Sequence, residues 1–304
     1  MRGDDILAIQ QRLSAAGFAV QQDGLYGQQT AAAIRQFQNR NGLKSDGVIE
    51  AATWLALFRD ASIASGDFSS QYPASPMARL VEFLTLEKLA ILKAEHRRYH
   101  DGCSWSLSPA GLRIDRAQAS EAEKKLAKHV LAQFAGPLAS ALAQFPVPVE
   151  LVIACICAES SGRPEALRLE PGCDQNNPEQ TPEKVSAGLM QPLLSTARAA
   201  LNDRTLKLSA LADPAVSIAA GAAYMWRQGL ETGFDPPLAA AAYNAGCIRY
   251  NGAAGNRWKL LQYPIGTSEH CDRFVRFFNA AIALERIDDF PNFRSLLTAD
   301  ENLS

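Results

Sequence analysis

The residue whose chemistry stands out in this sequence is an acid at the end of an apolar segment. Residues 149–158 are apolar almost throughout, and Glu159 follows them directly, ahead of Ser160-Ser161-Gly162. The positions three, four and seven residues before Glu159 are apolar, so a helix would place them on its side. Burial of a carboxyl group favours its protonated form and raises its pKa, as a general acid near neutral pH requires. The alternative is an acid that reaches solvent at a frayed helix end.

Two later segments combine small residues with polar side chains where a ligand could approach closely. Residues 186–191 are Ser-Ala-Gly-Leu-Met-Gln, and residues 240–246 are Ala-Ala-Ala-Tyr-Asn-Ala-Gly. Together with Glu159-Ser160, and in this order, they resemble the soluble lytic transglycosylase domain, a relative of goose-type lysozyme. The stretch 213–224 between them also fits the pattern of that family.

This resemblance implies a role for each matching residue. Glu159 matches the family's catalytic acid/base, and Tyr243 matches the tyrosine that orients this acid. The positions expected to bind substrate are Ser160, Gly188, Met190, Gln191 and Asn244. The implied reaction is cleavage of the β-1,4 bond between N-acetylmuramic acid and N-acetylglucosamine in bacterial peptidoglycan. The acid protonates the leaving oxygen and then accepts the proton of the muramic C6 hydroxyl, which closes on C1 to give a 1,6-anhydro sugar.

The stretch 163–185 is longer than the typical connection in that family and leaves a second mechanism open. It contains five acids: Glu165, Glu170, Asp174, Glu179 and Glu183. The simpler interpretation is a solvated surface loop. If one of these acids instead holds a water opposite Glu159, at roughly 6.5–9.5 Å, inverting hydrolysis is favoured. We expect transglycosylation, with a hydrolytic muramidase as the alternative. A second departure, Pro192-Leu193-Leu194 after Gln191, is expected to alter the edge of the groove.

A short duplication marks the first sixty residues. Asp23-Gly24 is followed by Thr30, and Asp46-Gly47 is followed at the same spacing by Thr53. Asp-Gly favours a turn with positive φ, and threonine favours a helix N-terminus, so each threonine is predicted to cap a helix. With a first helix that ends at Gly17, the pattern predicts a compact three-helix unit.

Residues 4–58 also strongly resemble the small peptidoglycan-binding domain of many cell-wall enzymes. The resemblance rests on turn, cap and core residues that run from Ile9-Gln10 to Asp46-Gly47-Val48. The residues that it assigns to the binding module are Asp23, Gly24, Tyr26, Gly27 and Thr30. The alternative is a generic three-helix bundle whose glycines only make turns.

The predicted fold is mainly α, with two domains. Residues 1–60 form a three-helix peptidoglycan-binding domain, and residues 61–77, rich in Ser, Gly, Ala and Pro, form a flexible linker. Residues 78–304 form an α-rich, lysozyme-like lytic transglycosylase domain, with its core at about residues 140–280. We expect a helix in the run 120–142, and at most a small β element, near Ser104–Ile114.

Composition excludes several classes of protein. The chain has 304 residues, with 30 Lys and Arg against 32 Asp and Glu, so it has no electrostatic footprint for nucleic acid and no polybasic patch for a membrane. No apolar stretch is long enough for an integral membrane segment. The tryptophans Trp105, Trp226 and Trp258 are compatible with either core packing or sugar stacking.

Cysteine and histidine spacing argues against a metal centre. The six cysteines are scattered, and Cys155 and Cys157 are expected to fill core. The pairing of Cys173, Cys247 and Cys271 is left open. His96 and His100 have the spacing of zinc ligands, but Arg97 replaces the glutamate of an HExxH site. We therefore interpret them as part of a solvated basic face, and expect no metal and no cofactor.

The biological setting follows only indirectly. The N-terminus offers no apolar core for a signal peptide, so we expect a monomer made in the cytoplasm that acts on peptidoglycan in the periplasm or cell wall. The expected routes are holin-dependent release, as for phage endolysins with this domain order, or delivery by a secretion system. The alternative of another class is a non-catalytic wall-binding component of a phage or secretion machine, which the presence of Glu159, Tyr243 and Asn244 disfavours.

Overall fold

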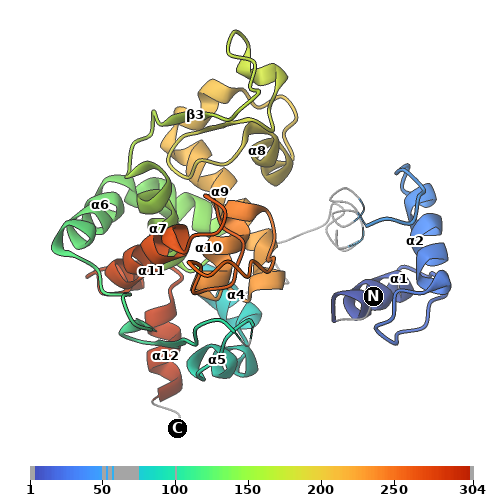
Figure 1. Cartoon of the computed structure of the whole chain (residues 1–304), viewed down its shortest axis with the longest axis horizontal. Helices are drawn as coiled ribbons and strands as arrows, with labels where there is room; N and C mark the ends of the chain where they lie inside the picture. Colours follow the sequence, from blue (N-terminus) through green and yellow to red (C-terminus); the bar gives the residue numbers. More distant parts are fainter. Residues whose placement is uncertain (1–3, 50–52, 54–56, 58–74, 100, 302–304) are drawn as a thin grey trace. The chain divides into compact units, whose positions relative to one another are not determined.

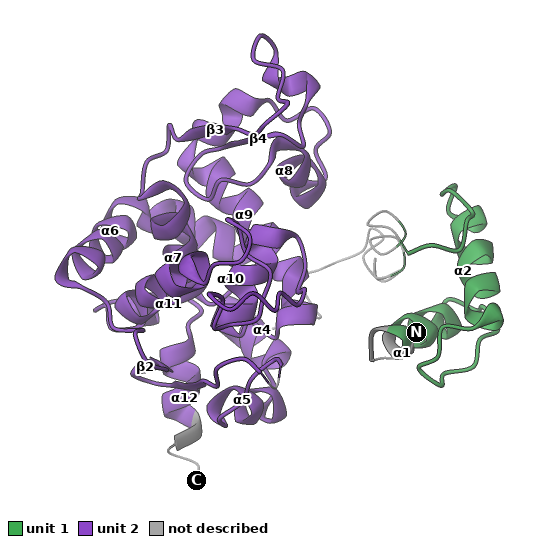
Figure 2. Ribbon diagram, viewed as in Figure 1, with its two compact units in different colours: residues 1–72 green, residues 73–304 purple. Residues whose placement is uncertain are grey.

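The computed structural model describes residues 4–49, 53, 57, 75–99 and 101–301. The chain divides into two compact units, Met1–Tyr72 and Pro73–Ser304 (Figure 2). Most of the predicted linker, from residue 61 to residue 74, lies outside the described residues, and helix α4 begins at Pro76. The fold is mainly helical in both units, as the sequence predicts.

The smaller unit contains α1 (Asp4–Ala15) and α2 (Gln28–Arg40) (Figure 1). Apolar residues spaced by three and four on these helices meet in a small core. Its buried members are Ile9, Leu13, Ala33, Ile34, Phe37 and Leu57. The third predicted helix, which follows Thr53, falls largely on residues that the structure does not describe.

Two buried glutamines organise the duplicated turns of this unit. The Gln10 amide donates to Oδ1 of Asp23, to the Leu25 carbonyl and to the Thr30 hydroxyl, and its Oε1 accepts from Gly24 N. Gln38 repeats this pattern, with Asp46, Val48 and Thr53 as acceptors and Gly47 N as donor. The duplication in the sequence is therefore a duplicated hydrogen-bond network around one side chain in each copy.

The prediction that Thr30 caps a helix is wrong. The N-cap of α2 is Gly27, with φ −110° and no side-chain cap hydrogen bond. Thr30 lies inside the helix, where its hydroxyl donates to the Leu25 carbonyl and accepts from Gln10. Because these two hydrogen bonds engage the hydroxyl, Thr30 does not occupy the N-cap position that threonine usually prefers.

The larger unit is a bundle of helices with two small hairpins (Figure 1). Before the central helix it contains α4 (Pro76–Phe83), α5 (Leu86–Lys93), β1 (Ser106–Ser108), β2 (Gly111–Arg113) and α6 (Glu121–Gln144). The elements from α7 to α9 are α7 (Val149–Ser160), β3 (Leu167–Leu169), β4 (Val185–Ala187), α8 (Leu194–Leu201) and α9 (Pro214–Thr232). The last helices are α10 (Pro236–Ala245), α11 (Glu269–Ile282) and α12 (Phe293–Glu301).

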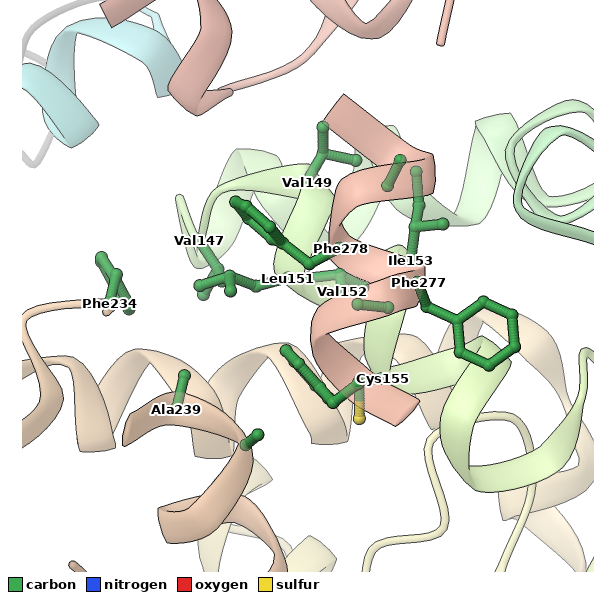
Figure 3. Packing of buried hydrophobic residues seen from close by; sticks show 14 of the residues in the cluster. Val147, Val149, Leu151, Val152, Ile153, Cys155, Phe234, Ala239, Phe277 and Phe278 are labelled. Carbon is green, nitrogen blue, oxygen red and sulfur yellow. The ribbon is translucent and has the colours of Figure 1, made fainter. Parts of the chain in front are cut away.

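Helix α7 lies at the centre of this unit. All of its residues except Glu159 are buried, and it packs most extensively against α11 and also against α6. Val152 and Cys155 of α7 and Phe278 of α11 belong to the same apolar cluster (Figure 3). The side chains of Cys155 and Cys157 fill core, as predicted, and all six cysteines are free. A helix that is apolar on every side is stable only in such a place.

The two hairpins meet the β prediction only in part. The antiparallel pair β1–β2 lies within the expected stretch 104–114. A second antiparallel pair, β3–β4, was not expected, so the prediction of at most one small β element is wrong. Its strands have three residues each, β3 is exposed throughout and β4 is buried throughout, so neither carries the alternating pattern that marks a half-buried strand.

His96 is not part of a solvated basic face. Its Nε2 lies 2.7 Å from Oδ2 of Asp235, the N-cap of α10, and its Nδ1 lies 2.8 Å from the Ala94 carbonyl. The indole of Trp105 donates to the same Asp235 carboxylate. His100 is outside the described residues.

The three tryptophans of the larger unit lie in its core or pack against it. Trp105 and Trp258 are almost fully buried, and Trp226 is partly buried between Phe83 and Phe234. No helix in the described parts of the chain combines the length and apolarity needed to cross a membrane.

A second acid, Glu150, is fully buried at the start of α7. Its Oε1 accepts from the backbone N–H groups of Phe293 and Arg294 at the start of α12, and its Oε2 has no partner among the described residues. Burial raises the pKa of Glu150 to about 7, although those two N–H groups and the Arg294 charge oppose the shift. The folded chain therefore binds a proton at Glu150 that the unfolded chain releases near its ordinary pKa of 4.5.

We predict that Glu150→Gln removes a pH dependence of stability. Because the folded pKa is raised, the contribution of Glu150 is present below pH 4.5 and is lost as the pH rises to about 7. Relative to wild type, the variant should gain on the order of 3 kcal/mol between pH 5 and pH 8. Denaturant unfolding at each pH measures this difference, and parallel curves for the two proteins would contradict it.

Candidate functional site

A cleft of about 530 Å³, lined by both polar and apolar groups, lies in the larger unit beside the end of α7. Four of the predicted site residues line it: Glu159, Gln191, Tyr243 and Asn244. Segments far apart in the sequence form its wall, namely the end of α7, the β3–β4 hairpin, the start of α8, and parts of α9 and α10. A larger cavity of about 750 Å³, lined by Arg113 and Arg257 among others, contains none of the predicted site residues.

Glu159 combines access to this cleft with an apolar setting. Its side chain is 19% exposed, at the end of a helix whose other residues are all buried. Burial raises the pKa of Glu159 to about 7, and the positive charges of Arg273 and Arg168 oppose this shift. The carboxyl group is therefore substantially protonated near neutral pH, which is the state that a general acid needs.

Tyr243 lies at the end of α10, almost buried in the same wall. Its hydroxyl donates to the Met190 carbonyl at 2.9 Å, and its ring packs edge-on against Tyr224. Burial is the main cause of the raised pKa of Tyr243, and the neighbouring Cys155 and Glu159 raise it further. Its only proton is committed to Met190, so this hydroxyl donates no hydrogen bond to Glu159.

Gln191 fastens the β3–β4 hairpin to the wall of the cleft. Its amide donates to the carbonyls of Ala166 and Gly188, both at 2.8 Å, and its Oε1 accepts from the Ser186 hydroxyl. Gln191 has φ 50°, a conformation that a non-glycine residue adopts only where its surroundings hold it. The side chain shapes the cleft because its polar atoms already have partners.

Asn244 positions a second segment at the edge of the cleft. Its Oδ1 accepts from the backbone N–H of Tyr263 at 2.7 Å. Tyr263 lines the cleft and is 48% exposed, so its ring is available to a ligand. Tyr224, Tyr243 and Tyr263 are the aromatic side chains of this wall.

Three residues predicted to bind substrate are not among those that line the cleft. Ser160 is buried and its hydroxyl donates to the Ile156 carbonyl one turn back. Met190 is fully buried against Gly221. Gly188 borders a different cavity, and its φ of 81° and the proximity of Leu211 and Ser217 leave no room for a side chain. These three residues therefore contribute to the packing behind the cleft wall.

Residues missed by the sequence analysis complete the site. Tyr224, Tyr263 and Arg168 line the cleft, and His270 of α11 brings its Nε2 to 3.8 Å from Oε1 of Glu159. A lone histidine near the start of an amphipathic helix carries no signal of its own, because its partner is 111 residues away in the sequence. Among the residues that the structure describes, no three His, Cys, Asp or Glu side chains gather as metal ligands.

The five residues predicted for the binding module hold its turns together. Asp23, Gly24 and Thr30 belong to the Gln10 network, and Gly27 is the N-cap of α2. The Tyr26 hydroxyl donates to the Gly47 carbonyl in the other copy of the repeat. Each of the five residues therefore has a structural role in the folded module, independent of any contact with a ligand.

Comparison with known families matches both units. Residues 2–57 match the peptidoglycan binding domain, and residues 137–263 match the transglycosylase SLT domain. The chain carries a peptidoglycan-binding domain followed by a transglycosylase SLT domain. The SLT domain makes it a lytic transglycosylase-type enzyme and implies cleavage of the glycan strands of peptidoglycan. The resemblances inferred from the sequence are thus confirmed for both domains.

Other comparisons add little. A search of curated protein sequences gave no match. Among solved structures, the Burkholderia AP3 phage endolysin is 17% identical, with 92% of this chain and 96% of that chain covered. The TM-score of that superposition is 0.19, too low to establish a common arrangement of the whole chain.

We predict that Gly188→Ala severely disrupts the SLT domain. A Cβ at this position would overlap the Leu211 carbonyl and the Ser217 hydroxyl, and both of these residues are fully buried. The expected loss of stability is about 3 kcal/mol. Gly233→Ala is the matched control, because Gly233 also has positive φ (60°) but nothing near the new Cβ, and it should cost only about 1 kcal/mol. Equal losses in thermal or denaturant unfolding would contradict the assignment.

Proposed function

We propose that this enzyme cleaves the β-1,4 bond between N-acetylmuramic acid and N-acetylglucosamine with Glu159 as its acid/base. The observation that carries the proposal is a single, partly buried carboxyl, with its pKa raised to about 7, at the wall of the cleft. Gln191, Tyr243 and Asn244 line the same cleft and support this choice of site. A glycan lying in the cleft would have its glycosidic oxygen within reach of this carboxyl group.

In the favoured mechanism one carboxyl serves both halves of the reaction. Protonated Glu159 gives its proton to the glycosidic oxygen as the bond to C1 breaks. The resulting carboxylate takes the proton of the muramic C6 hydroxyl, whose oxygen bonds to C1 and forms the 1,6-anhydro sugar. Glu159 ends protonated, so no water and no second catalytic carboxyl are needed.

The exposed ring of Tyr263 supports a carbohydrate as the ligand. Sugar rings present apolar C–H faces that pack on aromatic rings, and a tyrosine that is 48% exposed at a cleft offers such a face. Asn244 fixes the backbone of Tyr263. We assign Tyr263 to glycan binding, a part that the core tryptophans cannot take.

A hydrolytic muramidase is the second candidate, because two acids of the stretch 163–185 line the same cleft. These are Glu170 and Glu183. Glu170 is paired with Arg168 at 2.8 Å, whereas Glu183 is exposed and has no ion pair among the described residues. Glu183 is therefore the better candidate to hold a water opposite Glu159. The other three acids are elsewhere: Glu165 borders a different cavity, Asp174 accepts from Asn176 and Asn177, and Glu179 binds Leu208 N.

The place of action follows from the two domains. Both families concern peptidoglycan, so we propose that the enzyme acts at the bacterial cell wall. Holin-dependent release, as for an endolysin, and delivery by a secretion system both remain compatible with this proposal. We further propose that the enzyme acts as a monomer, without a cofactor or metal.

We predict that Glu159→Gln abolishes lysis of purified sacculi and leaves the fold intact. The amide keeps the shape of the side chain but cannot donate a catalytic proton, so turnover should fall by at least about 100-fold. Mass spectrometry of the muropeptides from the wild-type digest should give 1,6-anhydromuramic acid ends. Persistent lysis by Glu159→Gln would show that another residue is the acid.

The same digest decides between the two mechanisms, with Glu183→Gln as the control. If transglycosylation is correct, this variant keeps its anhydro products and most of its rate. Reducing muramic ends in the wild-type digest, lost together with activity in Glu183→Gln, would instead establish the hydrolytic muramidase.

We predict that removal of residues 1–60 weakens binding to sacculi but spares turnover of soluble glycan fragments. The larger unit has a hydrophobic core of its own, and the binding domain is expected to act by raising the local concentration of polymeric substrate. Cosedimentation with sacculi and kinetics on soluble fragments measure the two effects. An equal loss on both substrates would argue against simple tethering.

A further inference from the structure

The cleft acid has a histidine neighbour that the mechanism above does not use. His270, the second residue of α11, is 4% exposed, and its Nε2 lies 3.8 Å from Oε1 of Glu159. This Nε2 is buried and has no hydrogen-bond partner among the described residues. A buried polar atom without a partner is costly, so its position beside the cleft acid calls for an explanation.

The ring of His270 is neutral near pH 7. Burial, helped by the Arg273 charge, lowers its pKa to about 4, and a hydrogen bond with the backbone of Ala240 opposes this shift. A neutral imidazole carries one proton, and a backbone carbonyl is its acceptor when such a bond raises the pKa. Since Nε2 is the unpartnered atom, the proton belongs on Nδ1. Nε2 therefore presents a bare lone pair toward Glu159.

A lone pair beside a carboxyl group distinguishes its two charge states. A protonated Glu159 can donate to Nε2, whereas a carboxylate would place a second lone pair against it. The separation of 3.8 Å is longer than a hydrogen bond, so the two side chains must approach each other for this bond to form. Hydrogen bonds at catalytic groups are often long before substrate is bound.

The other groups around Glu159 do not replace this acceptor. Arg273 on α11 and Arg168 on β3 are positive and favour the carboxylate. Cys155 on α7 and Tyr243 on α10 are buried, and their raised pKa values keep both neutral. The Tyr243 hydroxyl donates to Met190, and no hydrogen bond joins it to Glu159 in the part of the chain that the structure describes. His270 is thus the neighbour that favours the protonated state of Glu159, whereas the two arginines favour the carboxylate.

We propose that His270 is a positioning residue for Glu159: its bare Nε2 accepts the carboxyl proton, so that the pair holds one proton and Oε1 is oriented for the bound substrate. This inference rests on the proposed role of Glu159 as acid/base. During cleavage the proton passes from Glu159 to the leaving oxygen, and His270 stays neutral. The carboxylate left beside the Nε2 lone pair is a stronger base, which favours return of a proton from the C6 hydroxyl of the substrate.

The test is the pH profile of lysis in His270 variants. In His270→Phe the site stays buried but loses its acceptor, so the alkaline limb, where Glu159 loses its proton, should move down by about one pH unit. In His270→Gln the amide oxygen can accept, and the limb should return toward the wild-type position. His129→Gln, a change at an exposed histidine on α6, is the matched control and should leave the profile unchanged. An unmoved limb in folded His270→Phe would overturn the proposal.

A second measurement needs no variant and no activity. In ¹⁵N-labelled wild-type protein, long-range ¹H–¹⁵N spectra should show His270 neutral between pH 5 and pH 8, with its proton on Nδ1. A proton on Nε2, or titration of His270 within that range, would overturn the proposal even if His270→Phe fails to fold. The two proposals can be disproved separately. Lysis by Glu159→Gln would disprove the role of Glu159. If Glu159→Gln is inactive but the alkaline limb of the pH profile does not move in His270→Phe, only the role of His270 is disproved.

Discussion

The desolvation of one carboxyl group at the end of α7 is the constraint around which the SLT domain is built. A helix that is apolar on every side must lie in the centre of the domain, and Glu159, as its penultimate residue, is carried to the edge of the core. The environment that raises its pKa is therefore the same packing that stabilises the fold. Two arginines oppose this effect without cancelling it. The packing of α7 thus accounts both for the stability of the domain and for the protonated state of Glu159.

Small residues allow the surrounding helices to approach this point closely. The alanine-rich α10 contacts α7, α9 and α11, and Gly221 of α9 accepts the Met190 side chain where any Cβ would overlap it. Met190 in turn offers its carbonyl to Tyr243. Several residues that the family pattern marks as functional thus act on the cleft through packing, while Glu159, Gln191 and Asn244 line it directly.

The sequence predicted the mainly helical fold, both domain families and the central acid, because each has a local signature. The apolar run before Glu159 is continuous, and the Asp-Gly turns recur at a fixed spacing. It could not place His270 beside Glu159, or Tyr263 at the cleft beside Asn244, since only tertiary packing brings these residues together. The β3–β4 hairpin was missed because a strand exposed on both faces, paired with one buried on both, has no periodic pattern. His96 was misjudged because its partner, Asp235, is distant in the chain.

The twin glutamine networks of the binding domain carry a chemical liability. Gln10 and Gln38 each use the amide nitrogen to donate to three oxygens, one of them on an aspartate. Deamidation of either would replace those donors with a second lone-pair-bearing oxygen and set a new negative charge against Asp23 or Asp46. Both side chains are almost fully buried, which limits the access of water to the amides. The same burial that fixes the turns therefore also protects the module against chemical ageing.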